Sequence, residues 1–157
     1  MKKKLFAILL SVMMIFNSSP VSLMAEETDT AYAIFTEDNE LIFFRSEETY
    51  ENGTSQTATI NDNEYTGTVY TGFEDTSYSI EEICIDQDEG IYEETSDLPW
   101  FDVRSQVTSV SIPAGTDIHP ISTAYWFYGF SSATSFDLSG LDTSNVTDMS
   151  SMFNSCS

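Results

Sequence analysis

The stretch ATSFDLSGLDTSNVTDMSSMFNSCS, residues 133–157, decides the predicted fold because it repeats the pattern of the residues before it. Set beneath residues 107–131 without a gap, it gives an offset of 26 residues with four identities in 25 positions. Apolar positions coincide more often, as in the pairs Val110/Phe136 and Phe127/Phe153. A period of roughly 20–50 residues is typical of proteins built from stacked repeats.

The second copy divides into two parts with different hydrophobic spacing. Phe136 and Leu138 alternate with polar residues, which predicts a short strand. Thr147 is a candidate N-cap, and Asp148 would lie in a first helical turn, where negative charge favours the helix dipole. Apolar residues then follow at helical spacing: Val146, Met149, Met152, Phe153 and Cys156. A strand and a short helix in each repeat predict a leucine-rich-repeat-like solenoid.

Residues 26–106 have the short, alternating patterns of a β-rich unit. We predict two hairpins and one further strand: 31–36 with 40–45, 57–60 with 64–72, and 77–85. The acidic stretch 86–97 is interpreted as a surface loop, and Trp100, Phe101 and Val103 return the chain to a core. The predicted fold class is therefore α+β. A β-rich capping region at 26–106 precedes a degenerate opening repeat and a first, truncated repeat at 107–157.

Residues 1–25 have the pattern of a secretory signal peptide. Lys2, Lys3 and Lys4 precede an apolar run of 12 residues, which is shorter than the roughly 20 that a membrane-spanning helix needs. Cleavage after Ala25 would leave 26 acidic residues and two basic ones, a net charge of 2 − 26 = −24. Such a chain would be repelled by nucleic acid and by anionic membranes. We therefore expect an exported protein, at the cell surface or extracellular, with no membrane span after cleavage.

The segment FDLSGLDTSNVTDMSSMFNSCS, residues 136–157, resembles one repeat of the BspA-like leucine-rich-repeat surface proteins. The preceding PISTAYWFYGFSSATS resembles a degenerate opening repeat of that family, and AYAIFTEDNELIFFR resembles the region that often follows the signal peptide. The resemblance implies an exported bacterial protein that binds host or bacterial partners through a solenoid face. It supplies no catalytic residues. It also implies that these residues are the N-terminal fragment of a longer protein.

Chemically active motifs are absent from the sequence. The single histidine, His119, aligns with Asn145 and is interpreted as a turn or surface residue without a nucleophile motif. Cys156 aligns with Phe130 and is interpreted as a small buried hydrophobe, not as a disulfide partner of Cys84. Trp100, Trp126, Tyr125 and Phe127 could form an aromatic binding patch, but core packing is the commoner role. We predict no catalytic residue, no metal ligand and no cofactor.

Three functions follow from these observations. The favoured one is a non-enzymatic surface or secreted protein that binds a protein or cell-surface partner. The second is a self-contained binding module with a weak calcium site in the acidic stretch, where the acids could act as ligands: Asp86, Asp88, Glu89, Glu93, Glu94 and Asp97. Gly90 stands one position too early for an EF-hand loop, which weakens that alternative. The third is the N-terminal part of a surface enzyme with a catalytic domain further along the chain.

Overall fold

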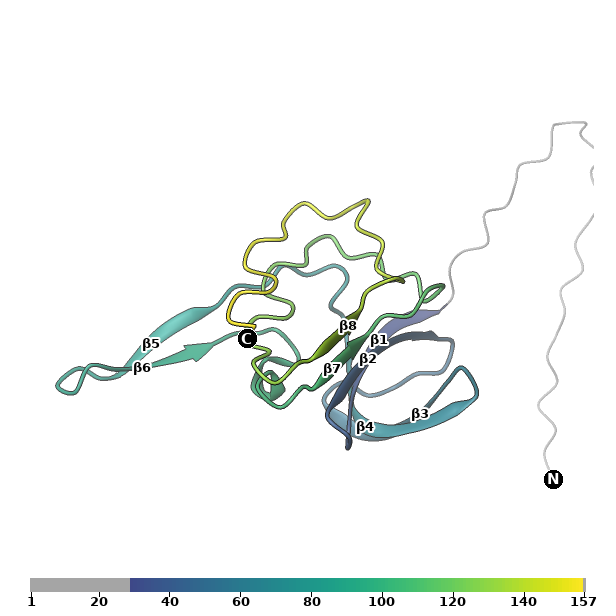
Figure 1. Ribbon diagram of the computed structural model, residues 1–157, viewed down its shortest axis with the longest axis horizontal. Coiled ribbons are helices and arrows are strands. Elements are labelled where there is room, and N and C mark those ends of the chain that lie inside the picture. Colours follow the sequence, from purple (N-terminus) through teal and green to yellow (C-terminus); the bar gives the residue numbers. More distant parts are fainter. Residues whose placement is uncertain (1–28, 157) are drawn as a thin grey trace, which may run out of the picture.

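The computed structural model describes residues 29–156, so the predicted signal peptide, residues 1–25, lies outside the described residues. A six-stranded mixed sheet has the order β3-β4-β1-β2-β7-β8, and β5 and β6 form a separate hairpin (Figure 1). The strands are β1 Thr30–Thr36, β2 Glu40–Ser46, β3 Thr54–Ile60, β4 Asn63–Thr71, β5 Glu81–Asp86, β6 Ile91–Thr95, β7 Ser109–Ser111 and β8 Ser135–Asp137. A 3-10 turn at Phe101–Val103 is the only helical element among the described residues.

Turn residues that tolerate positive φ set the register of the two predicted hairpins, which the structure confirms. Asn39 has φ 62° at the β1–β2 turn, and Asn61 and Asp62 have φ 51° and 65° at the β3–β4 turn. Asn and Asp adopt this left-handed conformation more readily than most residues. The resulting registers pair Ile34 with Ile42 and Ile60 with Asn63.

The central strands β1 and β2 are buried on both faces, which explains their nearly continuous apolar sequence. On one face, Tyr32 and Phe44 pack in a core formed by β1–β4 and the β2–β3 connection. On the other face, Ala33 and Phe43 pack in a larger core that includes residues from the C-terminal third of the chain. The sheet therefore separates two hydrophobic cores.

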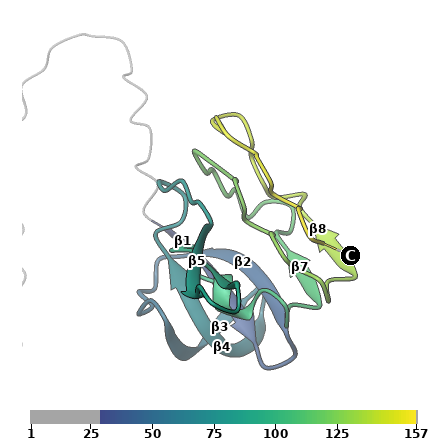
Figure 2. The ribbon, with the colours of Figure 1, turned by 90° about the vertical axis from the view of Figure 1, so that its left-hand side faces the viewer.

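The sheet continues across the boundary predicted at residues 106/107. Strand β7 pairs in parallel with β2, so that Leu41 lies opposite Val110. Strand β8 pairs in parallel with β7, so that Val110 lies opposite Phe136. Figure 2 shows β7 and β8 following one another at the end of the sheet. The pair Val110/Phe136 has the 26-residue offset of the sequence repeat, so this part of the alignment is confirmed.

Residues 107–131, which include β7, and residues 133–156, which include β8, form two stacked segments, here called the inner layer and the outer layer. Backbone N–H groups of residues 123, 125, 127 and 129 donate to carbonyls of residues 148, 150, 152 and 154 at 2.9–3.1 Å. Conformation repeats with the sequence: Tyr125 and Ser151 have φ 61° and 54°, while Gly129 and Ser155 have φ 71° and 61°. Each layer thus satisfies alternate polar groups of its neighbour.

The predicted α+β fold with a leucine-rich-repeat-like solenoid is wrong. No α-helix occurs in residues 29–156, and the strands of both layers belong to the same mixed sheet as β1 and β2. The predicted helix at 147–156 does not form because its carbonyls bond to the inner layer and its positive φ values interrupt helical geometry. The Asp148 carboxylate accepts from the Ser150 N–H at 2.8 Å, a local bond that competes with a helix.

The gap-free alignment fails between the strands and the second half of each layer. Ile118 bridges to Leu141, an offset of 23, whereas Ser122 bridges to Asp148, an offset of 26. The turn after β7 contains three more residues than its counterpart after β8, and the outer layer recovers them before Asp148. His119 therefore approaches Asp142 and does not superpose on Asn145.

Aromatic residues of the inner layer pack against the β-rich unit. Trp126, Phe127 and Phe130 have no exposed side-chain area. Phe43 of β2 stacks on Trp126 with ring centroids 5.7 Å apart, and Trp100 packs edge-on against both rings. These contacts make the inner layer and the sheet a single folded unit.

Candidate functional site

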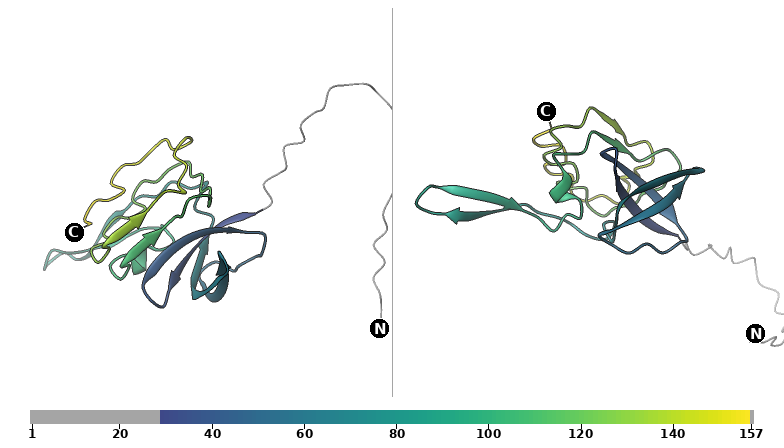
Figure 3. Two further views of the ribbon diagram at one scale, coloured as in Figure 1. Left: turned by 45° about the vertical axis from the view of Figure 1, so that its right-hand side comes forward. Right: turned by 90° about the horizontal axis from the view of Figure 1, so that it is seen from below.

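The hairpin of β5 and β6, residues 81–95 and here called the arm, extends away from the six-stranded sheet and from both layers (Figures 1 and 3). Two sequence predictions need correction here. The strand predicted at 77–85 begins only at Glu81, and the acidic stretch 86–97 contains strand β6 instead of a loop. The signal for this strand is compositional, because Ile91, Tyr92 and Thr95 are of the β-branched and aromatic types that favour strands.

Large apolar side chains are exposed on the arm. The exposed fractions are 48% for Ile83, 58% for Ile85, 41% for Ile91 and 62% for Tyr92. A two-stranded hairpin has no third layer to cover such residues, and an isolated hairpin is marginally stable in water. Clustered exposed apolar side chains mark interaction sites on soluble proteins. The arm is therefore the strongest candidate for a contact surface in the described part of the chain.

The base of the arm is attached firmly to the inner layer. The Tyr128 hydroxyl donates to Glu94 Oε1 at 2.6 Å, and Arg104 lies 3.5 Å from Glu94 Oε2. The hydrogen bond to Glu94 is the main reason that the pKa of Tyr128 is raised. Just outside the arm, the Ser96 hydroxyl donates to the Ser79 carbonyl at 2.6 Å and so connects the segments that lead into and out of the hairpin. These contacts fix the direction in which the arm extends.

The arm carries a concentrated negative charge. Seven of its residues are acidic and none is basic: Glu81, Glu82, Asp86, Asp88, Glu89, Glu93 and Glu94. Glu82 lies directly opposite Glu94, and Glu93 lies opposite Ile83. A pair of like charges on opposing strands destabilises a hairpin. Its cross-strand pairs therefore contribute little to the stability of the arm.

The structure gives no support to the calcium alternative. Asp86 accepts from the N–H groups of Asp88 and Glu89 at 2.9 and 3.1 Å, which forms the turn at the tip. Glu93 and Glu94 lie on β6, on opposite faces of the strand, so the two carboxylates cannot bind one ion together. Across residues 29–156, no group of three or more His, Cys, Asp or Glu side chains is placed to hold a metal ion.

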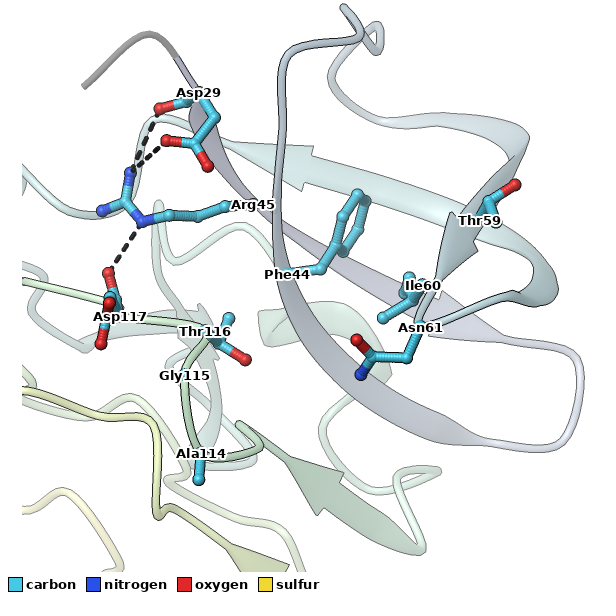
Figure 4. A pocket seen from close by; sticks show the side chains of 10 residues that line it. All are labelled: Asp29, Phe44, Arg45, Thr59, Ile60, Asn61, Ala114, Gly115, Thr116 and Asp117. Atoms are coloured by element: carbon cyan, nitrogen blue, oxygen red, sulfur yellow. Dashed lines mark hydrogen bonds and ion pairs between the residues drawn. The ribbon is translucent and has the colours of Figure 1, made fainter. Parts of the chain in front are cut away.

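A polar hollow of about 290 Å³ lies between β2, the β3–β4 turn and residues 114–117 (Figure 4). Arg45 crosses one side of it, donating from Nε to the Asp117 carbonyl at 2.7 Å and from Nη1 to the Asp29 carbonyl at 3.2 Å. Its Nη2 donates to both carboxylate oxygens of Glu74 at 2.8 and 3.1 Å. This arginine joins three segments of the fold, so the hollow is a poorer candidate for ligand binding than the arm.

His119 and the two cysteines were the remaining candidates for chemically active residues, and their contacts are as follows. His119 Nδ1 lies 3.2 Å from Asp142 Oδ2 and links the two layers. Hydrogen bonds hold the pKa of Asp142 below its usual range, with the larger effect from Ser144 and a smaller one from His119. Cys156 is half-buried, with its thiol directed at the Phe127 carbonyl and its pKa raised by burial. Cys84 is exposed on the arm, and neither cysteine forms a disulfide.

Most of the residues considered for an aromatic binding patch are not exposed. Trp100, Trp126 and Phe127 are buried, so core packing is confirmed for these three. Phe153 and Met149, predicted to lie on the apolar face of a helix, are instead 46% and 49% exposed on the outer layer. Met152 is buried against the larger core.

Comparisons with protein-family models, curated proteins and solved structures found no match to this chain. The resemblance to BspA-like proteins therefore stays a prediction from the quoted residues. Within residues 29–156, no helix has the length and apolar character needed to cross a bilayer.

Proposed function

We propose that this chain is an exported, non-enzymatic protein that binds a protein or cell-surface partner and makes that contact with the arm. The observation that carries the proposal is the exposure, between 41% and 62%, of Ile83, Ile85, Ile91 and Tyr92 on a hairpin that projects from the body. Burial of apolar area contributes about 25 cal/mol per Å². A partner that covers these side chains would gain a favourable contribution that the isolated chain lacks.

Two features of the sequence support export and adhesion. The N-terminal 25 residues have the pattern of a signal peptide, and residues 136–157 resemble a repeat of a family of exported surface proteins. The resemblance supports surface binding as the role but not a solenoid as the binding element. The arm supplies an alternative contact surface that uses no repeat.

The proposal is tested by coupling the exported protein to beads and measuring attachment of bacterial cells and of extracellular-matrix proteins. The variant Ile91→Ser/Tyr92→Ser removes two apolar side chains from β6 without touching the base of the arm. We expect its half-saturation concentration to rise at least about tenfold, since burial of each side chain is worth about 1.5–3 kcal/mol. Ile121→Ser, at a residue 41% exposed outside the arm, is the matched control.

Circular dichroism and a denaturant titration establish that both variants fold. Equal attachment by the wild type and the double variant would overturn the role of the arm. Failure of the wild type to attach to any of these surfaces would overturn the adhesion proposal.

A further inference from the structure

We infer that the outer edge of β6 accepts an extended, basic segment of the partner as a third strand of the arm. The inference rests on the proposed function and names the chemistry of the partner. It depends on three observations, namely an unpaired strand edge, an irregularity confined to β5, and the charge of the side chains beside that edge.

Both outer edges of the arm lack a neighbouring strand in the described part of the chain, because the small sheet contains only β5 and β6. An open edge presents N–H and C=O groups that can pair with another chain. Peptides often bind by adding a strand to such an edge, so that backbone hydrogen bonds supply affinity and alternate side chains supply specificity. The exposed apolar residues Ile91 and Tyr92 belong to β6 itself, so a strand added at its edge would meet an apolar side chain on each face.

The two edges differ in regularity. The pairing between β5 and β6 shifts register between Cys84 and Asp86, which leaves Ile85 as an extra residue on β5. A bulge bends its strand and twists the edge away from further pairing. Residues 91–95 of β6 contain no extra residue, so β6 offers the more regular edge.

Side-chain alternation along β6 specifies what the added strand should carry. Ile91 and Glu93 share one face, while Tyr92 and Glu94 share the other. Glu94 is already bound by Tyr128 and Arg104 at the base. Basic side chains on the Glu93 face would therefore meet an unoccupied carboxylate, with their aliphatic stems over Ile91. Apolar side chains would lie on the Tyr92 face.

Charge complementarity decides between possible occupants. A second copy of the arm would bring seven acidic residues against seven more, and opposed like charges destabilise strand pairs. Nucleic acid is excluded by the same repulsion. A segment with Lys or Arg at alternate positions would instead place these cations beside Glu93, in an arm that has seven acidic residues and no basic one. The partner is therefore a protein with an exposed, extended basic segment.

The probe for the test is a synthetic peptide of about ten residues that alternates Val and Lys, the pattern that suits pairing across β6. Calorimetry measures its binding to the exported protein, and hydrogen exchange measures protection of the amides of residues 91–95. Two matched peptides serve as controls. One replaces two Val residues with Pro, which cannot donate the backbone hydrogen bonds, and the other replaces Lys with Glu.

We expect the Val–Lys peptide to bind and to protect amides of β6, with weaker binding at high salt. Glu93→Lys should weaken binding at least about tenfold by turning an attractive pair into a repulsive one. Glu64→Lys, a charge reversal at an exposed residue of β4, should change it by less than about twofold, because charges beyond a Debye length are screened.

Equal affinity for the Pro-containing peptide would overturn strand addition, as would binding that leaves the β6 amides unprotected. Absence of binding at millimolar peptide would overturn it too. Different results would overturn adhesion through the arm and strand addition at the edge of β6. Loss of cell attachment in Ile91→Ser/Tyr92→Ser without peptide binding would retain the arm as a contact and exclude edge pairing. Peptide binding without any effect of that variant on attachment would exclude the arm from adhesion.

Discussion

Replacing Gly140 with alanine should separate the inner and outer layers. A Cβ atom built on Gly140 would lie 2.1 Å from the Pro113 carbonyl oxygen and 3.1 Å from that of Ile112. Both obstacles are backbone atoms of the inner layer, so no side chain can rotate away. The Pro113 carbonyl oxygen would need to retreat from 2.1 Å to at least 3.4 Å to reach an ordinary contact distance.

The expected cost follows from the bonds at this point of contact. The Gly140 N–H donates to the Ile112 carbonyl at 2.7 Å, and the Gly140 carbonyl accepts from the Ile118 N–H at 3.0 Å. Each bond contributes about 1 kcal/mol, and forcing an extra methyl group into a packed site costs about 1–3 kcal/mol. We therefore expect Gly140→Ala to lower the free energy of unfolding by about 3 kcal/mol in a urea titration.

Two further glycines make the measurement specific to close approach. Gly67 on β4 lies against the Phe35 carbonyl at the same Cβ distance of 2.1 Å, so Gly67→Ala should cost a similar amount. Gly115 has φ 86° with no atom within 4 Å of its Cβ, so Gly115→Ala should cost only about 1 kcal/mol, for its left-handed conformation. The reasoning is refuted if Gly140→Ala is no more destabilising than Gly115→Ala.

Three other outcomes follow from the core and from the base of the arm. Trp100→Phe should lower the free energy of unfolding by at least about 1 kcal/mol more than Trp126→Phe does in urea titrations, and equal losses would contradict this. Trp100 Nε1 donates to the Trp126 carbonyl at 2.6 Å, whereas Trp126 Nε1 has no hydrogen-bond partner within residues 29–156. Tyr128→Phe removes the bond to Glu94 and should speed hydrogen exchange in β6 about fivefold while leaving exchange in β1 unchanged; unaltered exchange in β6 would show that Glu94 does not hold the arm. Burial raises the pKa of Tyr70, and the bond to Glu94 raises that of Tyr128, so the neutral tyrosines stabilise the fold below pH about 10 and this contribution is lost as pH rises through the folded pKa values. The melting temperature should therefore fall as pH rises above about 10, and a fall of the same steepness in Tyr70→Phe would exclude Tyr70 as a cause.

Local sequence predicts the β1–β2 and β3–β4 hairpins well because their turns and their burial pattern are short-range properties. Asn39 ends one turn and Asn61 begins the other, each with a positive φ that most residues adopt less readily, and the strands beside them are rich in apolar residues. The repeat offset of 26 also predicts the pairing of Val110 with Phe136, since parallel strands from successive copies place equivalent residues side by side. Trp126 and Phe127 could be assigned to a core because large aromatic side chains are more often buried than exposed.

The arm could not be found with the same certainty, because the sequence of residues 81–95 suits either a solvated loop or a strand pair. Seven acidic residues suggest solvent exposure, while Ile83, Ile85, Ile91 and Tyr92 suggest burial. Only the tertiary structure shows that both suggestions hold in part, with apolar side chains on a hairpin that no other segment covers. The candidate site is thus a consequence of the direction of the hairpin, which depends on Arg104 and on the more distant Tyr128, 34 residues after Glu94.

The sequence by itself determined the β1–β2 and β3–β4 hairpins, because they depend on turn conformation and on hydrophobic spacing within a few residues. The 26-residue repeat determined the pairing of β7 with β8. The tertiary structure decided whether residues 147–156 are helical. Their apolar spacing fits a helix, but their carbonyls accept hydrogen bonds from N–H groups of the inner layer about 25 residues earlier. A backbone group bonded to a neighbouring layer is unavailable to the turn of helix above it, so residues 150–155 form successive tight turns instead of a helix.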